Sequence, residues 1–202
     1  MKREIAKRLL KIKAVFFRPD RPFTWASGIK SPVYCDNRLI LTDVEVRNFI
    51  EEAIAETVKK EFPDCEVLMG TSTAGIAHAA IAAHMLQIPM GYVRASAKGH
   101  GRENRIEGKL ELGQKTVVIE DLISTGASAV DSVLALRKAG AEVLGIVSIF
   151  TYGLQKGKDA MAAADVKHFS LTDFDTVVGE AAEDGYIEGD DVDKLISFRD
   201  SL

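Results

Sequence analysis

Cysteine is scarce in this sequence: Cys35 and Cys65 are the only two among 202 residues. Two cysteines with no cysteine or histidine pattern around them are too few for a disulfide framework or a zinc cluster. They also give no support to thiol catalysis, which needs a thiol activated by its neighbours. We therefore expect reduced thiols in a cytoplasmic protein.

Long hydrophobic runs and an excess of positive charge are also missing. No apolar run reaches the roughly 18 residues needed to cross a bilayer, and charges interrupt the apolar residues of the N-terminal stretch MKREIAKRLLKIKAVFF. The formal net charge is -4, whereas a dedicated nucleic-acid-binding domain is usually basic. We expect neither a membrane nor a nucleic acid as a partner.

What is present is an ordinary globular composition, with 47% hydrophobic and 28% charged residues. A chain of this length can bury a core of its own, so we expect a single domain over 1–202. From about residue 64 onward, short β-rich runs alternate with helical segments. The runs are CEVLMG, IPMGYV, TVVIE, EVLGIVSIF and VKHFSL. This alternation predicts an α/β fold with a mostly parallel, doubly wound sheet that helices cover on both faces.

Residues 1–63 do not follow that pattern. Helices are expected over about 2–13 and from the capping pair Thr42–Asp43 to about Phe62. The stretch between them is rich in proline, which lacks a backbone donor and restricts the residue before it. We expect 1–63 to form a hood over an α/β core of 64–202 that includes the C-terminal helices.

The segment TVVIEDLISTGASAV combines an apolar strand with two acids and a helix start. Glu120 and Asp121 follow the strand residues, and small residues then lead into the helix: Ser124, Thr125, Gly126, Ala127 and Ser128. Free N–H groups and the helix dipole make such a start an anion site. Carboxylates beside it accept hydrogen bonds from the hydroxyls of a sugar. The pattern therefore favours a sugar phosphate over a helix that is merely capped.

The segment VVIEDLISTGAS resembles the signature of the type I phosphoribosyltransferases, which use 5-phosphoribosyl 1-pyrophosphate (PRPP). That resemblance implies that Glu120 and Asp121 hold the ribose hydroxyls while residues 124–128 hold the 5′-phosphate. A second stretch, YVRASAKGHGRENRIEG, is rich in glycine and cations, which is typical of a mobile lid. A lid bearing lysine and histidine suits a pyrophosphate leaving group.

Further segments resemble the orotate branch of that family, so the resemblance covers nearly the whole chain. The branch's mobile loop carries Arg, then Lys-x-His-Gly, which falls here on Arg94, Lys98, His100 and Gly101. Its orotate segment falls on Phe23, Thr24, Ser27, Gly28, Ser31, Pro32 and Tyr34. GTSTAGIAH resembles its pyrophosphate loop and includes Thr71, Ser72, Thr73, Ala74 and Gly75.

The resemblance implies transfer of ribose 5-phosphate from PRPP to orotate, giving orotidine 5′-monophosphate and pyrophosphate in pyrimidine biosynthesis. Lys98, His100 and Asp121 are then the expected catalytic residues, with Arg94 as a further PRPP contact. Ser124 and Tyr152 are added to the orotate contacts. Magnesium is expected near Glu120 and Asp121, held mainly by PRPP and water. A homodimer is implied, in which the loop over 94–108 reaches the neighbouring subunit's site.

The sequence also departs from the family's pattern. Where many members carry lysine, this chain has Ala26, Ala74 and, just after the loop arginine, Ala95–Ser96. Where one branch has an arginine that meets orotate, this chain has Thr151–Tyr152. The sequence therefore does not identify the group that holds the orotate carboxylate, nor the effect of the missing loop lysine.

Two alternatives stay open on the same fold. One is a phosphoribosyltransferase for another base, which the orotate-like segment disfavours because purine enzymes of the fold do not share it. The other is a PRPP-sensing regulator that keeps the phosphate site without the chemistry. The retained Lys98 and His100 disfavour this regulator, and so does the acidic charge balance.

Overall fold

A six-stranded sheet in the order β10-β9-β8-β5-β6-β7 forms the centre of the protein. The computed structural model describes residues 1–18, 22–24, 30–96 and 105–202. The parallel strands are β5 (Val67–Thr71), β6 (Met90–Val93), β8 (Lys115–Ile123), β9 (Glu142–Thr151) and β10 (Lys167–Asp173). Strand β7 (Ile106–Glu107) joins β6 antiparallel at one edge. The predicted mostly parallel sheet is confirmed, whereas β7 is too short for a periodic signal and was not predicted.

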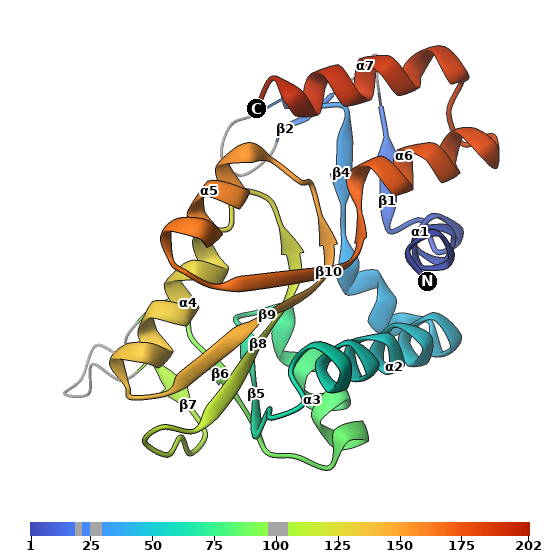
Figure 1. Ribbon diagram of the computed structural model, residues 1–202. Coiled ribbons are helices and arrows are strands. Elements are labelled where there is room, and N and C mark those ends of the chain that lie inside the picture. Colours follow the sequence, from blue (N-terminus) through green and yellow to red (C-terminus); the bar gives the residue numbers. More distant parts are fainter. Residues whose placement is uncertain (19–21, 25–29, 97–104) are drawn as a thin grey trace.

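Helices cover both faces of this sheet (Figure 1). One face carries α2 (Val44–Glu61) and α3 (Gly75–Leu86), and the other carries α4 (Ala127–Lys138) and α5 (Gln155–Ala163). Because successive strand residues point to opposite faces, Val117 and Ile119 of β8 join one apolar core while Val118 joins the other. The doubly wound arrangement follows from this two-sided burial.

The predicted helix ends are found where the capping chemistry places them. Asp43 accepts a hydrogen bond from the backbone N–H of Val46 (3.0 Å) and so caps α2, which ends at Glu61 before Pro63. Helix α4 stops at Lys138 ahead of Gly140, whose φ of +93° favours glycine.

Two N-terminal helices belong to the core, so the whole of 1–63 does not act as a hood. Helix α1 (Lys2–Lys11) packs on β10 and on α6 (Phe174–Glu183), with Ile5 and Leu9 fully buried. Helix α2 buries Ile50 and Ile54 in the same core. Apolar stripes on both helices explain this, because such a stripe is stable only against another apolar surface.

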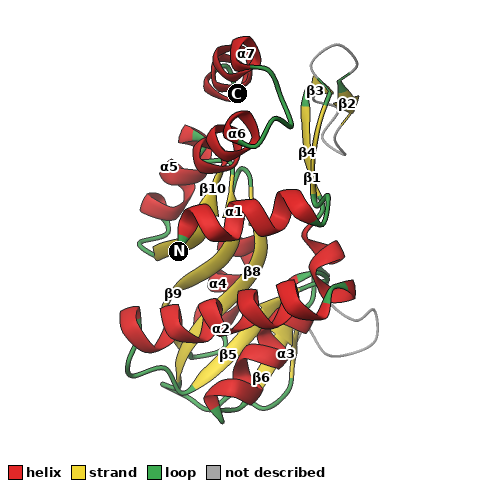
Figure 2. Ribbon diagram, turned by 90° about the vertical axis from the view of Figure 1, so that its right-hand side faces the viewer, coloured by secondary structure: helices red, strands yellow, loops and turns green. Residues whose placement is uncertain are grey.

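The part that stands over the sheet is smaller, and we call it the hood (Figure 2). It consists of two antiparallel pairs, β1 (Val15–Phe17) with β4 (Val33–Cys35) and β2 (Phe23–Thr24) with β3 (Lys30–Ser31). A short 3-10 helix, η1 (Asn37–Thr42), leads from the hood to α2, and α7 (Gly189–Asp200) follows α6. No helix formed by the described residues is long and apolar enough to cross a membrane.

Candidate active site

Glu120 and Asp121 lie inside β8, near its carboxyl end, and not after it as the sequence suggested. The strand continues to Ile123 because β9 pairs with it as far as Thr151. Glu120 is buried and Asp121 half-buried, and the Asp121 N–H donates to Glu120 Oε1 (3.0 Å). Burial, helped by the hydrogen bond and negative charge of Asp121, raises the pKa of Glu120 to about 8. The Glu120 carboxyl is therefore mostly protonated at neutral pH.

Residues 124–128 turn from β8 into α4 beside this acid pair. Gly126 has a φ of +76°, which favours glycine, and it precedes the first residue of the helix. No side chain among the described residues caps α4, so N–H groups of its first turn are available to a ligand. Ser124 and Thr125 are half-buried, while Ala127 and Ser128 are exposed. This turn, which we call the phosphate cradle, presents an anion site to solvent.

The loop from Thr71 to Gly75 joins β5 to α3 and lies against β8. Thr71 Oγ1 donates to the carbonyl of Ile119 (3.3 Å). The N–H and the hydroxyl of Ser72 both donate to the carbonyl of Val93 (3.0 and 2.6 Å). A Cβ on Gly75 would lie 2.5 Å from the Ile119 oxygen, so only glycine allows this close approach. Thr73 is exposed and Ala74 half-buried, which leaves the loop open to a ligand.

The two loops meet where the strand order changes direction. From β5 the chain continues to β6 on one side, and from β8 it continues to β9 on the other. In open α/β sheets the crevice beyond the carboxyl ends of two such strands is the usual ligand site. The acid pair, the phosphate cradle and the Thr71–Gly75 loop all lie at that crevice.

Arg94 stands at the base of the cationic loop, directly after β6. Its N–H donates to the carbonyl of Arg105 and the Nε of Arg105 donates back to the carbonyl of Arg94, both at 2.8 Å. The Arg94 Nη1 atom lies 3.7 Å from Glu107 Oε1 and has no hydrogen-bond partner among the described residues. These contacts hold the Arg94 guanidinium against β7 at the base of the cationic loop.

The hood brings several predicted orotate residues together. The rings of Phe23 and Tyr34 lie 5.6 Å apart between centroids, and both line a cavity of about 290 Å³ with Thr24, Phe16 and Arg18. The Arg18 guanidinium lies 4.6 Å from the centroid of Phe23. Four predicted site residues fall outside the described residues: Ser27, Gly28, Lys98 and His100.

Tyr152 does not lie where an orotate contact requires it. Its side chain is 3% exposed and packs between the rings of Phe150 and Phe174, at centroid distances of 5.0 and 5.8 Å. Burial raises the pKa of its hydroxyl, and the Cys35 backbone is hydrogen-bonded to it. Tyr152 therefore packs in the core beneath the hood and has no face open to a ligand.

Asn37 is a site residue that the sequence reasoning missed. Its Nδ2 donates to the backbone carbonyl of Asp121 (2.7 Å), and its Oδ1 accepts from the Cys35 thiol (3.3 Å). The signal available in the sequence was a short polar run, Cys35–Arg38, directly after the orotate-like segment. Asn37 fixes the carboxyl end of β8 to the hood.

Known proteins share both the sequence and the fold. The chain is 56% identical over 199 residues to orotate phosphoribosyltransferase of Bacillus subtilis (strain 168), covering 98% of this chain and 92% of that protein. The crystal structure of orotate phosphoribosyltransferase from Aeropyrum pernix matches with a TM-score of 0.78 and 29% identity, over 91% of this chain and 99% of that one. No family model matches the chain.

A more distant structure separates fold from chemistry. Adenine phosphoribosyltransferase from Leishmania donovani matches with a TM-score of 0.63 at 19% identity, over 85% of this chain and 80% of that one, and so shares the fold alone. The type I phosphoribosyltransferase fold is thus common to enzymes with different bases. The 56% sequence identity over nearly the full length of the chain distinguishes an orotate enzyme from an adenine enzyme of this fold. This chain belongs to the orotate phosphoribosyltransferase family of pyrimidine biosynthesis.

Proposed function

We propose that this chain transfers the ribose 5-phosphate group of PRPP to N1 of orotate, giving orotidine 5′-monophosphate and pyrophosphate. The observation that carries the proposal is an acid pair that lies between two open anion-binding loops at the strand-order switch. PRPP has the matching pattern, with hydroxyls between a 5′-phosphate and a pyrophosphate. Each group of PRPP then meets one part of the crevice.

The phosphate cradle over 124–128 would hold the 5′-phosphate through the free N–H groups of α4. Glu120 and Asp121 would hold the ribose 2′- and 3′-hydroxyls. The Thr71–Gly75 loop would bind the pyrophosphate through backbone N–H groups beyond Ser72, because both the N–H and the hydroxyl of Ser72 already donate to Val93.

The raised pKa of Glu120 gives the two acids different roles. A protonated Glu120 donates a hydrogen bond as well as accepting one. Partial neutralisation of the pair also lowers its repulsion of a ligand with several negative charges. Asp121, the more exposed acid, is therefore the better acceptor for a hydroxyl next to the reacting carbon.

Orotate would lie under the hood, where Phe23 and Tyr34 offer aromatic faces to a flat base. Thr24 and the half-buried Ser124 add hydroxyls. Arg18 lines this cavity, and we assign its guanidinium to the orotate carboxylate. That assignment supplies the group that the sequence left unidentified.

The loop over 94–108 would close on the pyrophosphate, with Lys98 and His100 stabilising the charge that develops on the leaving oxygens. Arg94, at the base of the loop, would supply a further positive charge to the pyrophosphate. We assign this loop to the neighbouring subunit's site in a homodimer. The reaction would take place in the cytoplasm, where the free thiols of Cys35 and Cys65 stay reduced.

Magnesium would lie near the acid pair, which could provide only some of its ligands. The described residues contain no cluster of three or more metal-ligating side chains, so the remaining ligands would be PRPP oxygens and water, as magnesium often prefers. Asp121 would supply carboxylate oxygen, which magnesium prefers as a ligand, with Glu120 beside it. When bound, the ion would neutralise charge on the pyrophosphate.

Base consumption tests the proposed function directly. The chain is mixed with PRPP and magnesium, then with orotate or with adenine, hypoxanthine or guanine in parallel. We expect orotate alone to be consumed, with one pyrophosphate released for each orotate. Consumption of a purine instead of orotate would show a different base, and PRPP binding without consumption of any base would show a regulator.

A further inference from the structure

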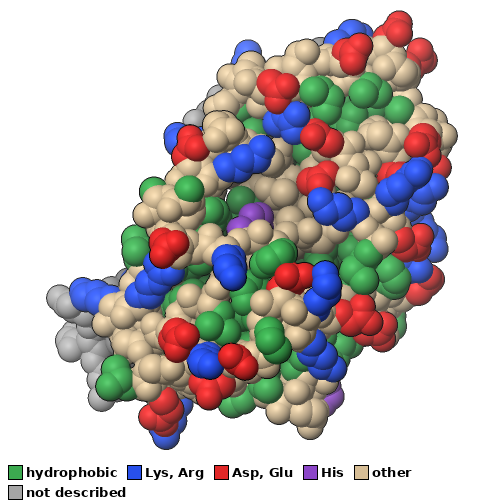
Figure 3. Space-filling view, in the orientation of Figure 1, with side chains coloured by type: hydrophobic (Ala, Val, Ile, Leu, Met, Phe, Trp, Pro, Cys, Tyr) green, Lys and Arg blue, Asp and Glu red, His purple; other side chains and the backbone are tan. Residues whose placement is uncertain are grey.

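A second cavity, of about 370 Å³, lies behind the phosphate cradle on the α5 side of the sheet. We name it the His168 cavity. Its apolar wall and its polar groups come chiefly from Ile123, Leu154, Met161, Thr151, Lys158 and His168. Figure 3 shows a hollow on this face with a histidine at its bottom, and His168 is the histidine that lines the cavity. Ser124 also lines this cavity, and it is the one lining residue to which a role is assigned above.

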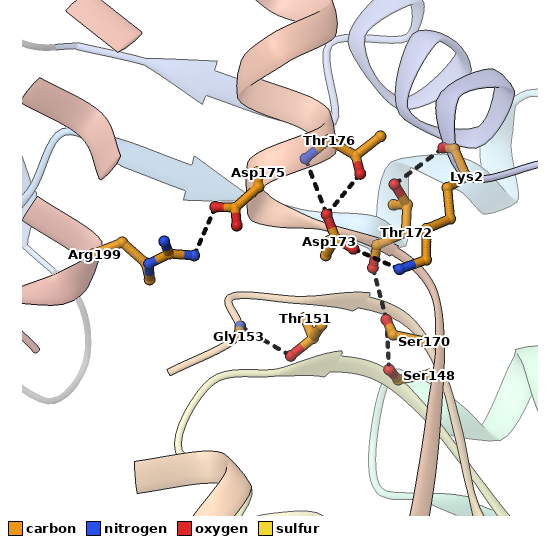
Figure 4. A network of polar contacts seen from close by, with 10 residues as sticks. All are labelled: Lys2, Ser148, Thr151, Gly153, Ser170, Thr172, Asp173, Asp175, Thr176 and Arg199. Atoms are coloured by element: carbon orange, nitrogen blue, oxygen red, sulfur yellow. Dashed lines mark hydrogen bonds and ion pairs between the residues drawn. The ribbon is translucent and has the colours of Figure 1, made fainter. Parts of the chain in front are cut away.

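A chain of hydrogen bonds fixes the tautomer of His168 (Figure 4 draws its serine and threonine members). Ser170 Oγ donates its single hydrogen to the Thr172 carbonyl (2.7 Å). Ser170 must therefore accept from Ser148 Oγ (3.0 Å), which uses the single hydrogen of Ser148. Ser148 Oγ in turn must accept from His168 Nε2 (2.8 Å). The ring proton is thus on Nε2, and Nδ1 has a bare lone pair.

That lone pair is open to the cavity. Burial lowers the pKa of His168 to about 4, so the ring is neutral at physiological pH. Nδ1 makes no hydrogen bond with the described residues, and it is not among the buried polar atoms that lack a partner. Since an unpaired atom that is not buried must face open space, Nδ1 presents an acceptor to a ligand.

Lys158 complements this acceptor at the rim. Its side chain is exposed, and it forms no ion pair with any residue in the described part of the chain. An acidic group on a ligand would find an unneutralised cation there. The apolar wall between Lys158 and His168 suits the flat face of a ring.

The cavity is mechanically connected to the phosphate cradle. A Cβ on Gly157 would lie 2.7 Å from the Ser124 carbonyl, and one on Gly126 would lie 2.8 Å from Met161 Cε. Helix α5 therefore contacts the cradle at two points, and at Gly157 it packs against the Ser124 backbone without spare room. A molecule that displaces α5 would move the cradle as well.

We propose that the His168 cavity is a second ligand site, for a single-ring heterocycle that offers an N–H donor to His168 Nδ1 and an acidic group to Lys158. Occupancy alters PRPP affinity through the contacts between α5 and the cradle, and this consequence rests on the proposed function. Binding itself does not rest on it. The cavity shares Ser124 with the proposed active site, but Lys158 and His168, which would hold the ligand, have no role there.

A matched pair of probes tests the site: pyrrole-2-carboxylate, which has the N–H, and furan-2-carboxylate, which replaces it with oxygen. Calorimetry is done with saturating orotidine 5′-monophosphate, so that the proposed active site is closed to both. We expect the pyrrole to bind about 5-fold more tightly, the effect of one hydrogen bond. Equal affinities, or no binding of either probe, would overturn the proposal.

Variants then locate the binding. Lys158→Ala should weaken pyrrole binding about 10-fold, whereas Lys156→Ala, an exposed lysine on the same helix, should leave it unchanged. His168→Phe keeps a ring at this position but has no hydrogen-bond acceptor, so it should abolish the preference for pyrrole over furan. Binding that none of these changes affects would contradict the site, and ¹⁵N NMR showing a proton on Nδ1 would contradict the tautomer. Turnover of orotate, measured separately, reports on the proposed function alone.

Discussion

Asn37 donates its side-chain amide to the backbone carbonyl of Asp121 over 2.7 Å, across a separation of 84 residues. Asn37 is 1% exposed and stands at the start of η1, immediately beyond the hood strand β4. The carbonyl it meets belongs to one of the two acids of the crevice. The hood is therefore fixed to the strand that carries the proposed ribose-binding acids.

Removal of this bond should affect both stability and PRPP binding. Asn37→Ala leaves a half-buried carbonyl without its partner, so the free energy of unfolding should fall by about 1–3 kcal/mol. The KM for PRPP should rise, because Asp121 loses its support. Urea unfolding and initial-rate kinetics measure the two effects. Asn48→Ala, an exposed residue on α2, is the control and should change stability by less than about 0.5 kcal/mol.

Gly75 should tolerate no side chain, because an added Cβ meets the Ile119 carbonyl and Thr71 Oγ1. We expect Gly75→Ala to destabilise the protein by about 1–3 kcal/mol and to weaken pyrophosphate binding. Gly179 of α6 is the matched control, since a Cβ there meets nothing within 4 Å. Gly179→Ala should stabilise the helix by roughly 0.5–1 kcal/mol. Thermal unfolding measures both variants. Equal changes in their melting temperatures would contradict the close approach of Gly75 to the Ile119 carbonyl.

Glu120 should make the stability of the unliganded protein fall as pH rises. Its pKa of about 8 lies above the ordinary 4.5, so the folded state binds more protons between these values. The stabilising contribution is complete below pH 4.5 and is lost as pH rises through about 8. Gln cannot ionise, so the Glu120→Gln variant does not lose this contribution. Its free energy of unfolding, relative to that of the unchanged chain, should therefore rise by roughly 1–3 kcal/mol from pH 5 to pH 9. Urea unfolding at both pH values measures this, and Glu56→Gln on exposed α2 surface should show no such gain.

Lys98→Ala should slow turnover far more than it weakens orotate binding. The expected cause is loss of charge stabilisation on the departing pyrophosphate, worth on the order of 10²-fold or more in kcat. Transient kinetics separate the chemical step from product release, and an unchanged chemical step would refute the role. Lys109→Ala is the control, because that exposed lysine pairs with Glu111 and not with the crevice.

Arg18→Ala should raise the KM for orotate about 10-fold, since a charged hydrogen bond to the carboxylate is lost. The KM for PRPP should stay within a factor of about 2, because Arg18 lies at the hood cavity and away from the cradle. Lys60→Ala removes an exposed cation on α2, which pairs with Glu61, and serves as the control. An equal rise in both KM values would indicate a general disturbance of the hood.

The parts of the site that the sequence predicted are those built from consecutive residues. The acid pair, the phosphate cradle and the start of α4 occupy one stretch over 120–128, and their N–H groups and hydroxyls follow from local backbone geometry. The alternation of β-rich runs and helices likewise predicted the parallel sheet, because apolar strands and amphipathic helices each need a covered face. Membership of the family follows from segments of this kind taken together.

The other features were decided by the tertiary structure alone, because they depend on which residues far apart in the sequence come into contact. The length of β8 is set by its pairing with β9, and the placement of α1 and α2 in the core by the apolar surfaces they find there. Burial between Phe150 and Phe174 removes Tyr152 from the orotate contacts. The Asn37–Asp121 bond and the high pKa of Glu120 arise from contact and desolvation, which no local pattern encodes. The sequence by itself determined the fold class and predicted the proposed ligand-binding segments, while packing determined how those segments are held and charged.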